Sequence, residues 1–232
     1  MVEYGDIEGI KNAITENTAA IMLEPLQGES GIILPPVGYM KAVENLCREN
    51  NILLIADEIQ TGLGRTGALF ACQHEKVRPD IMIIGKALSG GFYPVSAVLA
   101  DKSILGLIQP GEHGSTFGGN PLGAAVGIAA LEVIEEENLI ENSKIMGQYM
   151  LDYIEEIPKK NIHDIRGKGL FIGVELKHEL GGARRFAEIL QNKGILVKET
   201  HDHTLRIAPP LIIVKETIDW MLLILREVLL MD

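Results

Sequence analysis

The stretch "DIMIIGKALSGG", residues 80–91, predicts a buried strand that ends directly before a lysine. Residues 81–84 form an apolar run, Gly85 follows, and Lys86 is the first charged side chain after them. Lysine is rarely found at the end of a buried segment unless a partner or a reaction there needs its amine. The position of Lys86 therefore makes it a candidate functional residue.

Two earlier apolar runs end in the same way. "TAAIMLEP" (18–25) stops at Glu24, and "ILLIADE" (52–58) reaches Asp57. Apolar runs that alternate with helical segments, such as "GYMKAVENLCRENN" (38–51), predict a parallel sheet covered on both faces. The carboxyl ends of parallel strands share one edge, where open α/β sheets bind ligands. We therefore expect Glu24, Asp57 and Lys86 to face one crevice.

The second part of the chain has a different pattern. Residues 120–139 and 141–157 are predicted helices, the first with Asn120 as its cap and Pro121 in its first turn. After Pro158 we expect a strand at 165–176, a helix at 183–194, short strands at 195–200 and 204–213, and a closing helix at 215–230. The apolar face of the closing helix comprises Ile218, Met221, Leu222, Leu225 and Leu229. This pattern predicts one domain over residues 1–142 and a small α+β domain over 143–232.

Composition limits the classes of partner. The chain has 232 residues and a formal net charge of −11, which argues against nucleic acid and anionic membranes as partners. No apolar run approaches the length of a membrane span, and "MVEYGDIEGI" at the start does not resemble a signal peptide. Cys47 and Cys72 lie in predicted helices, so we expect buried thiols in a reducing cytoplasm.

A lysine and a carboxylate at adjacent strand ends suit a particular chemistry. Partial burial lowers the pKa of a lysine, and a neutral amine can form a Schiff base with a carbonyl such as that of pyridoxal phosphate (PLP). A neighbouring carboxylate, here Asp57, would keep the pyridine nitrogen of that cofactor protonated. The alternative is an ion pair between Lys86 and Asp57 that only ties two strands together.

A dinucleotide site is the rival interpretation, because "GLGRTG" (62–67) matches G-x-G-x-x-G. That fingerprint requires a strand that runs directly into the glycines and an acidic residue that ends a second strand about 20 residues later. Here residues 57–61 intervene, and Asp80 begins a strand instead of ending one. The sequence therefore favours the lysine site over the dinucleotide site.

Two loops offer further candidates. "EHGSTFGGNP" (112–121) contains the hydroxyls of Ser115 and Thr116 before a helix N-terminus, which suits an anion but also an ordinary capped loop. "THDHT" (200–204) contains His201 and His203, but no further metal ligand stands out beside them. We therefore expect solvated loop histidines rather than a zinc site.

Together the motifs resemble the class-III PLP-dependent aminotransferases over nearly the whole chain. The resemblance rests on "EPLQGESGIILPPVGYMKAV", "LLIADEIQTGLGRTGALFACQHEKVRPDI", "GKALSGGFYPVSAVLA", "GEHGSTFGGNPLGAAV", "IRGKGLFIGVEL" and "LRIAPPLII". Within the family, "GFYPVSAVLA" and "VKETHD" are most similar to the ornithine aminotransferase branch. The resemblance implies an α/β, type I PLP-dependent transferase fold: a partial large domain with a mainly parallel sheet, and a small α+β C-terminal domain.

The resemblance also implies roles for residues around the cofactor. Lys86 matches the lysine that holds PLP as a Schiff base and shuttles protons, Asp57 the pyridinium partner, and Gln60 the residue that hydrogen-bonds the 3-oxygen of the ring. Ser115 and Thr116 match a loop that reaches the cofactor phosphate of the neighbouring subunit, which implies a homodimer. Glu24 resembles a residue near the cofactor.

Substrate roles follow from the same resemblance. Arg206 matches the arginine that binds the α-carboxylate of the keto acid, for which a bidentate guanidinium is suited. Glu29 matches the residue that neutralises this arginine while ornithine is bound. The implied reaction moves the δ-amino group of ornithine to 2-oxoglutarate, giving glutamate semialdehyde and glutamate. Acetylornithine and 4-aminobutyrate are alternative substrates.

Family members carry a long N-terminal part before the segment that matches "YGDIEGIKNAI". That part holds a phosphate loop, an aromatic residue that stacks on the ring, residues that bind the α-carboxylate of ornithine, and the first strands of the sheet. We therefore expect a truncated or split version of the enzyme that needs an N-terminal partner chain, or else a non-catalytic fragment. Alone, it would leave an apolar sheet edge and apolar helix faces bare.

Overall fold

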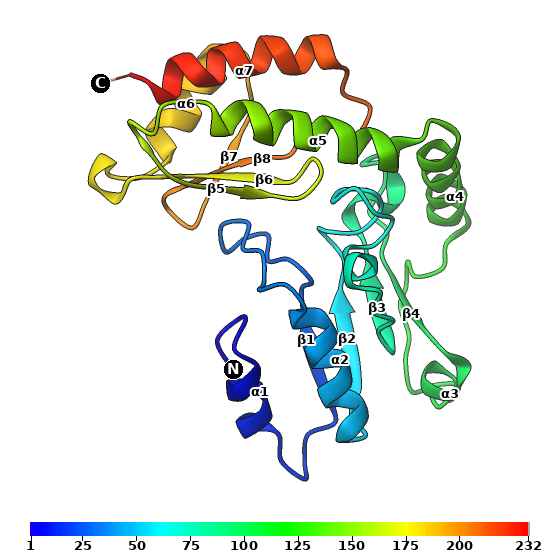
Figure 1. Cartoon of the computed structure of the whole chain (residues 1–232). Helices are drawn as coiled ribbons and strands as arrows, with labels where there is room; N and C mark the ends of the chain where they lie inside the picture. The colour runs from blue at the N-terminus through cyan, green and yellow to red at the C-terminus, as the bar shows by residue number, and fades with distance from the viewer. Residues whose placement is uncertain (232) are drawn as a thin grey trace. The chain divides into compact units, whose positions relative to one another are not determined.

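The computed structural model describes residues 1–231, which form two compact units (Figure 1). The first unit contains residues 1–25, 35–63 and 70–137. The second contains residues 26–34, 64–69 and the chain from residue 138 onward. Two short segments from the first third of the sequence thus join the C-terminal unit. The domain division expected at residues 142 and 143 stays a prediction.

A mainly parallel sheet forms the centre of the first unit. The strands are β1 (Ala20–Leu23), β2 (Leu53–Asp57), β3 (Ile81–Ile84) and β4 (Ala97–Ala100), in the order β1-β2-β3-β4. β1, β2 and β3 are parallel, whereas β4 runs antiparallel to β3. Glu24 follows β1, Asp57 ends β2 and Lys86 lies two residues after β3. The prediction that these three residues follow parallel strands at the same edge is therefore confirmed.

The helices of the first unit begin where the sequence provides caps. Asp6 accepts a hydrogen bond from the Gly9 amide at 2.8 Å, and Asn120 accepts one from the Gly123 amide at 2.8 Å, as expected for N-caps. The helix predicted around Cys72 is a short 3-10 helix, and a further short helix at 102–105 was not predicted. The helical elements are α1 (Ile7–Ala13), α2 (Tyr39–Glu49), η1 (Ala71–Glu75), η2 (Lys86–Ser89), α3 (Lys102–Leu105) and α4 (Pro121–Glu136).

The second unit contains an antiparallel sheet in the order β5-β6-β8-β7. The strands are β5 (Ile162–Gly167), β6 (Ile172–Leu176), β7 (Lys198–Thr200) and β8 (Thr204–Ile207), and the helical elements are α5 (Leu139–Glu155), η3 (His178–Leu180), α6 (Arg184–Asn192) and α7 (Lys215–Leu229).

One strand prediction in this unit was wrong. The run 165–176 was expected as a single strand, but it contains the turn of the β5–β6 hairpin. Gly169 adopts φ +57° in that turn, and a Cβ there would lie 2.4 Å from the carbonyl carbon of Thr66. Glycine is therefore required for both the turn and the close approach.

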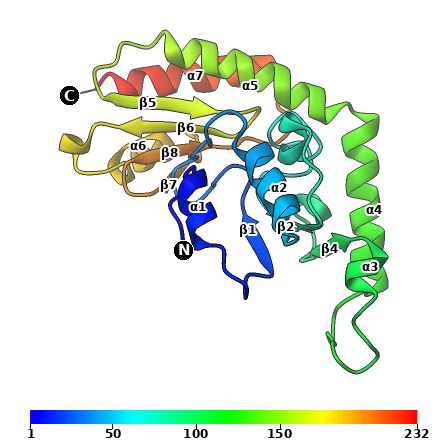
Figure 2. The same ribbon diagram turned by 60° about the horizontal axis from the view of Figure 1, so that its bottom comes forward.

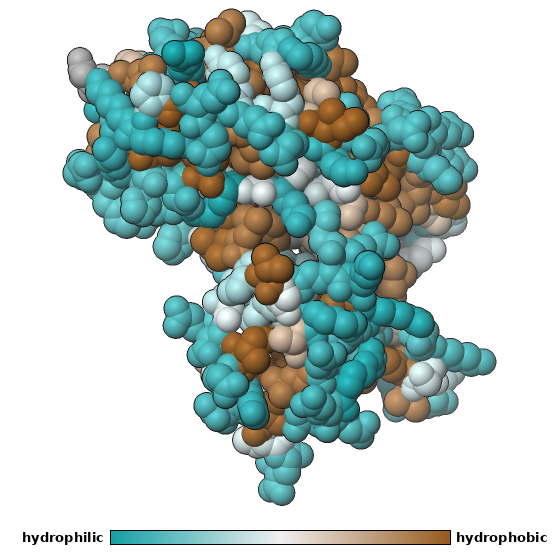
Figure 3. All heavy atoms as spheres, viewed as in Figure 1, coloured by the Kyte–Doolittle hydropathy of each residue, from teal (hydrophilic) through white to brown (hydrophobic). Residues whose placement is uncertain are grey.

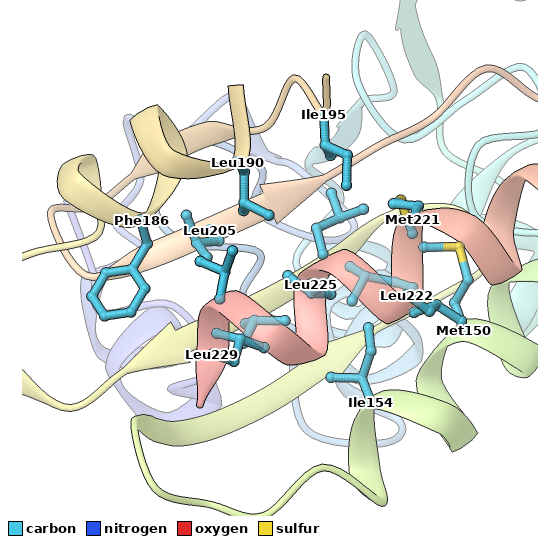
Figure 4. Close-up of a cluster of buried hydrophobic side chains, with 14 of the residues drawn as sticks. Met150, Ile154, Phe186, Leu190, Ile195, Leu205, Met221, Leu222, Leu225 and Leu229 are labelled. Carbon is cyan, nitrogen blue, oxygen red and sulfur yellow. The ribbon is translucent and has the colours of Figure 1, made fainter. Parts of the chain in front are cut away.

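Apolar side chains from the helices and the sheet form the core of the second unit (Figure 4). Phe186 and Leu190 of α6, Leu205 of β8, and Met150 and Ile154 of α5 converge on one face of α7. The five residues predicted for that face are all buried: Ile218, Met221, Leu222, Leu225 and Leu229. The prediction of an amphipathic closing helix is confirmed.

Both cysteines are core residues. Cys47 and Cys72 are free thiols with 0 % and 1 % exposure. Burial, followed by the charge of Asp80, raises the pKa of Cys47 to about 11. Burial, followed by the charge of Glu58, raises the pKa of Cys72 to about 12. Thiols with such high pKa values are unreactive, which agrees with the expected packing role.

Apolar side chains remain uncovered around β4 and α4 of the first unit. Val98 and Leu99 are adjacent on β4, so they point to opposite faces, yet they are 50 % and 44 % exposed. Figure 3 shows apolar side chains at the surface over α4, at the right of the view; the exposed ones on this helix are Leu122, Ile128, Leu131 and Val133. The exposed apolar side chains of the edge strand β4 and of α4 agree with the expectation of a bare sheet edge and bare helix faces.

Two adjacent leucines of α7 provide a test of the second core. Leu222 is 0 % exposed and Leu223 is 63 % exposed. Leu222→Ala leaves a cavity, and we expect it to lower the free energy of unfolding by about 2–5 kcal/mol. The matched control Leu223→Ala should change it by less than about 0.5 kcal/mol. Urea unfolding followed by circular dichroism measures both, and equal effects would contradict the placement of the α7 face.

Candidate functional site

The first unit contains a pocket of about 700 Å³ beside the end of β3. Its lining includes Lys86, residues 94–96 before β4, and the loop that leads into α4. Gly123 and Ala124 in the first turn of α4 complete one wall. Small-molecule sites typically occupy about 300–1,000 Å³, so the pocket has the size of such a site.

Lys86 reaches this pocket through an unusual backbone. Its φ is +42°, in the left-handed region that non-glycine residues rarely adopt. The preceding Gly85 is extended, and a Cβ there would touch Ser96 at 3.4 Å and Ile59 at 3.7 Å. The chain thus turns sharply after β3, between the segment that follows β2 and the segment that precedes β4. Such backbone strain concentrates at functional sites.

Asp57 lies on the strand adjacent to that of Lys86. It is half-buried, and its Oδ1 accepts a hydrogen bond from the Ile59 amide at 3.0 Å. This contact fixes the carboxylate relative to the segment that follows β2. Gln60, three residues after Asp57, is also half-buried. Neither residue belongs to the lining of the 700 Å³ pocket, so their meeting with Lys86 around one ligand stays a prediction.

Glu24, the third predicted strand-end residue, is half-buried at the same edge of the sheet. Its backbone carbonyl accepts a hydrogen bond from the Tyr4 hydroxyl at 3.0 Å. This contact holds the N-terminal segment against the end of β1 and assigns no chemistry to the side chain.

The segment that carries Asp57 and Gln60 is anchored by a residue that the sequence reasoning missed. Glu58 is 1 % exposed and accepts hydrogen bonds from the Thr61 hydroxyl and from the amides of Ala71 and Cys72, the latter two at 3.0 and 2.8 Å. Its own amide donates to Ile83 of β3 at 2.9 Å. The adjacent acidic residues of "ADE" gave no sign of which one is buried.

Ser115 and Thr116 lie on the long connection between α3 and α4 (Figure 2). Residues 106–119 of this connection are all exposed. Ser115 lines the pocket together with Lys86 of the same chain, and its Oγ accepts a hydrogen bond from the Gly118 amide at 3.0 Å. Thr116 is not part of the lining. The expectation that both residues serve a neighbouring subunit stays a prediction.

Glu29 and Arg206 form an ion pair in the second unit, although 177 residues separate them. Arg206 Nη1 donates to Glu29 Oε1 at 2.6 Å. Lys198 Nζ donates to the other oxygen, Oε2, at 2.8 Å. The predicted pair is therefore brought together, and Lys198 joins it as a cation that the sequence reasoning did not single out.

The loop that carries Glu29 is held by Arg166 of β5. Arg166 Nε donates to the carbonyls of Gly31 and Ile32 at 3.0 Å each, and Nη2 donates to Gly31 at 2.6 Å. Its Nη1 pairs with Glu175 at 2.7 Å. Burial raises the pKa of Glu175, but hydrogen bonds from Arg166 and His178 outweigh burial and leave it below its ordinary value. Every residue has a backbone carbonyl, so the residue types in the sequence do not indicate which carbonyls Arg166 binds.

Arg65 adds a further cation to the second unit. It donates to the carbonyls of Leu170 at 3.0 Å and Pro209 at 2.6 Å. Burial, followed by the charge of Arg206, lowers the pKa of the Arg65 guanidinium to about 10. The Arg206 guanidinium is therefore close enough for its charge to act on Arg65.

The "GLGRTG" segment does not form a dinucleotide-binding turn. No helix begins within it or directly after it in the described chain. Gly67 adopts φ +81°, and a Cβ there would lie 2.9 Å from Cβ of Lys144 on α5. The glycines serve loop packing, which removes the structural basis of the rival interpretation.

The two loop histidines make no metal cluster. Across residues 1–231, no three histidine, cysteine, aspartate or glutamate side chains are placed to hold a metal ion together. His203 instead stacks on His178, with ring centroids 4.3 Å apart. None of the helices within residues 1–231 is long and apolar enough to cross a membrane.

Comparison with known proteins gives consistent matches. The model of the family described as aminotransferase class-III matches residues 3–229. The ornithine aminotransferase of Oceanobacillus iheyensis is 55 % identical over 228 residues, which are 98 % of this chain and 56 % of that protein. The chain thus spans about half the length of the curated relatives it matches.

Solved structures with the same fold include enzymes with two different names. One is an ornithine aminotransferase from Toxoplasma gondii, described with partial occupancy of PLP at its active site. It matches with a TM-score of 0.94 and 39 % sequence identity, and the matched region covers 99 % of this chain and 55 % of that chain. An acetylornithine aminotransferase from Elizabethkingia anophelis has a TM-score of 0.93 and 43 % identity, with coverage of 99 % and 59 %.

The anchoring role of Glu58 is testable by a nearly isosteric change. In Glu58→Gln, one accepting oxygen becomes an NH₂ group that faces a buried N–H or O–H donor. An unsatisfied buried donor costs about 1–3 kcal/mol, so we expect the free energy of unfolding to fall by that amount. Glu49→Gln, at the exposed end of α2, is the matched control. Equal stability of the two variants in urea unfolding would show that Glu58 is not an anchor.

Proposed function

The chain belongs to the class-III aminotransferase family, and from that premise we propose that it is the lysine-bearing part of an ornithine aminotransferase. Family membership confirms the expected α/β fold class, the type I PLP-dependent transferase fold, and PLP is the cofactor of this family. The proposed reaction moves the δ-amino group of ornithine to 2-oxoglutarate, giving glutamate semialdehyde and glutamate. The observation that carries the proposal is Lys86 at a pocket directly after β3, with Asp57 at the end of the adjacent parallel strand.

The pocket residues suit PLP in chemistry, and the pocket has the size of a small-molecule site. The pocket holds an amine from Lys86 and a hydroxyl from Ser115 next to the N-terminus of the 16-residue helix α4. Such a helix end suits a phosphate, whose charge meets the amide groups and the helix dipole. Asp57, at the end of the adjacent strand, would accept a hydrogen bond from a ring N–H. Lys86 and Asp57 would thus serve the aldehyde and the ring nitrogen of one cofactor, and Ser115 with the helix end the phosphate of the cofactor in a neighbouring subunit.

Each residue would have a distinct task toward that cofactor. Bound PLP supplies a reactive carbonyl and an electron-accepting ring. Lys86 Nζ would hold the cofactor and would take up and return the proton of the substrate carbon. Asp57 would hold a proton on the ring nitrogen, and Gln60 would hydrogen-bond the 3-oxygen. Ser115 and Thr116 would bind, through their hydroxyls, phosphate oxygens of the cofactor in the neighbouring subunit.

Two residues of the second unit would select the substrate. Arg206 would bind a carboxylate of the keto acid with two parallel hydrogen bonds. Glu29 would neutralise Arg206 while ornithine is bound, since the Glu29–Arg206 pair at 2.6 Å occupies the guanidinium. Both partners are charged in this pair, so a substrate carboxylate can replace Glu29 without leaving the guanidinium unsatisfied.

The proposal includes partner chains. The match to about half of each relative and the exposed apolar residues of β4 and α4 support a need for an N-terminal half, either as a separate chain or in a longer protein. The exposed connection at 106–119, which includes Phe117 at 76 % exposure, supports a homodimer in which this loop contacts a second subunit. Two free thiols suit a cytoplasmic location.

Two alternatives have support of their own. The incomplete match to the relatives favours a non-catalytic fragment if no N-terminal half accompanies the chain. The 43 % identity to an acetylornithine aminotransferase structure keeps acetylornithine, and by the same family resemblance 4-aminobutyrate, as the amino donor.

Chemical labelling tests the assignment of Lys86. We expect PLP followed by borohydride reduction to label one lysine, Lys86, in the peptide map obtained by mass spectrometry. Lys86→Ala should abolish the label, whereas Lys102→Ala, at the start of α3, should keep it. A label on another lysine, or none even when the N-terminal part of a relative is supplied, would contradict the assignment.

Substrate comparison tests the reaction. We expect the chain, combined with the N-terminal part of the Oceanobacillus iheyensis relative, to transaminate ornithine with 2-oxoglutarate at least about tenfold faster than acetylornithine or 4-aminobutyrate, a difference of about 1.4 kcal/mol in the barrier. The rate of glutamate formation measures all three. A faster reaction with acetylornithine would contradict ornithine as the amino donor. Activity of the unaccompanied chain would exclude the fragment alternative.

A further inference from the structure

We propose that Lys198 is a positioning residue that lowers the cost of releasing Arg206 from Glu29. This inference rests on the proposed function, because it concerns the access of a keto-acid carboxylate to Arg206. Lys198 acts through Glu29 and does not itself contact the substrate.

The register of the sheet places Lys198 beside Arg206. The two residues are direct partners of the antiparallel pair β7–β8. Like charges directly opposite each other in a sheet repel, so the two strands need an anion between the side chains. Glu29 supplies it, with one carboxylate oxygen on each cation, at 2.8 Å from Lys198 Nζ and 2.6 Å from Arg206 Nη1.

Glu29 is fixed to the same strands by its backbone. The Thr200 hydroxyl at the end of β7 donates a hydrogen bond to the Glu29 carbonyl. Arg166 holds the next turn of the loop through the carbonyls of Gly31 and Ile32. The carboxylate therefore stays within reach of both cations. Its ion pair with one cation can weaken and the other strengthen without a movement of the loop.

The exposures of the three side chains differ in a way that suits this exchange. Arg206 is only 17 % exposed, whereas Glu29 and Lys198 are 55 % and 57 % exposed. When a substrate carboxylate takes Arg206, Glu29 loses one cation, but Lys198 still neutralises it at the solvent side. Lys198 thereby also reduces the repulsion between Glu29 and the incoming carboxylate.

The consequence of removing Lys198 follows directly. In Lys198→Met the carboxylate of Glu29 loses a cationic partner and binds Arg206 more tightly. Arg206 is then less available to any external reagent or anion. The pairs are exposed, so we expect effects of about two- to fivefold.

Modification of Arg206 by phenylglyoxal measures its availability in the 232-residue chain without any need for catalysis. Peptide mass spectrometry should show modification of Arg206 about two- to fivefold slower in Lys198→Met and unchanged in the conservative variant Lys198→Arg. Glu29→Gln should speed modification, and Lys198→Met should have no further effect in that background. An unchanged rate in Lys198→Met, or the same slowing in the Glu29→Gln background, would overturn the proposal.

Kinetics of the enzyme completed with the N-terminal part of a relative separates this inference from the proposed function. Lys198→Met should raise KM for 2-oxoglutarate about two- to fivefold and leave kcat and the KM for ornithine unchanged. An absence of transamination in the unmodified protein would refute the proposed function, while the modification rates would still decide the role of Lys198. Normal activity with an unchanged KM for 2-oxoglutarate would refute the inference alone.

Discussion

The parallel pairing of β2 with β3 is the constraint on which the proposed site depends. Asp57 lies opposite Ile83 in this register, so the chain leaves both strands at the same edge. In the proposed function, the carboxylate at the end of β2 binds the ring nitrogen. The lysine just beyond the end of β3 binds the aldehyde, so PLP requires at least these two groups. A shift of the register by one residue would turn Asp57 to the other face of the sheet. The apolar runs that bury these strands are therefore as important to the site as the two charged residues.

A buried carboxylate and a partly buried guanidinium, each bound to backbone groups, hold the two sets of proposed site residues. Glu58 ties the segment after β2 to η1 by hydrogen bonds to amides, and Arg166 ties the loop of Glu29 to β5 by hydrogen bonds to carbonyls. Neither charge faces the ligand in the proposed function. Each costs desolvation, which is offset by several charge-assisted hydrogen bonds in a fixed geometry. A ligand site made of loops needs such anchors, because loops lack the repeating hydrogen bonds of strands and helices.

The sequence predicted the parts of the fold whose cause is local. The end of β2 at Asp57, the end of β3 just before Lys86, the cap Asn120 and the buried face of α7 follow from apolar patterning and neighbouring residues. The β5–β6 hairpin was missed because its turn, "GKG", is followed directly by the apolar run at 170–172, so that the glycines resemble small residues inside one strand.

Residues that act at long range were found only through family resemblance or not at all. The pairing of Glu29 with Arg206 across 177 residues came from resemblance. The anchors Glu58 and Arg166 and the cation Lys198 were missed, since their partners are backbone groups or side chains that only tertiary packing brings close. Periodicity and capping report on neighbours in the chain, so they carry no information about such contacts.

The weakness of the Glu29 ion pairs is what makes them suitable for substrate selection. A fully buried pair would cost about 3–5 kcal/mol to break by loss of one partner, and a substrate carboxylate would have to repay that cost. A pair in which the carboxylate is 55 % exposed is worth at most about 1 kcal/mol, so an incoming anion can displace it. The guanidinium of Arg206 is nevertheless only 17 % exposed, which keeps its orientation defined while its partner changes. In the proposed function, the combination of a fixed cation with a loosely held anion would allow one site to accept first a cationic donor and then an anionic acceptor.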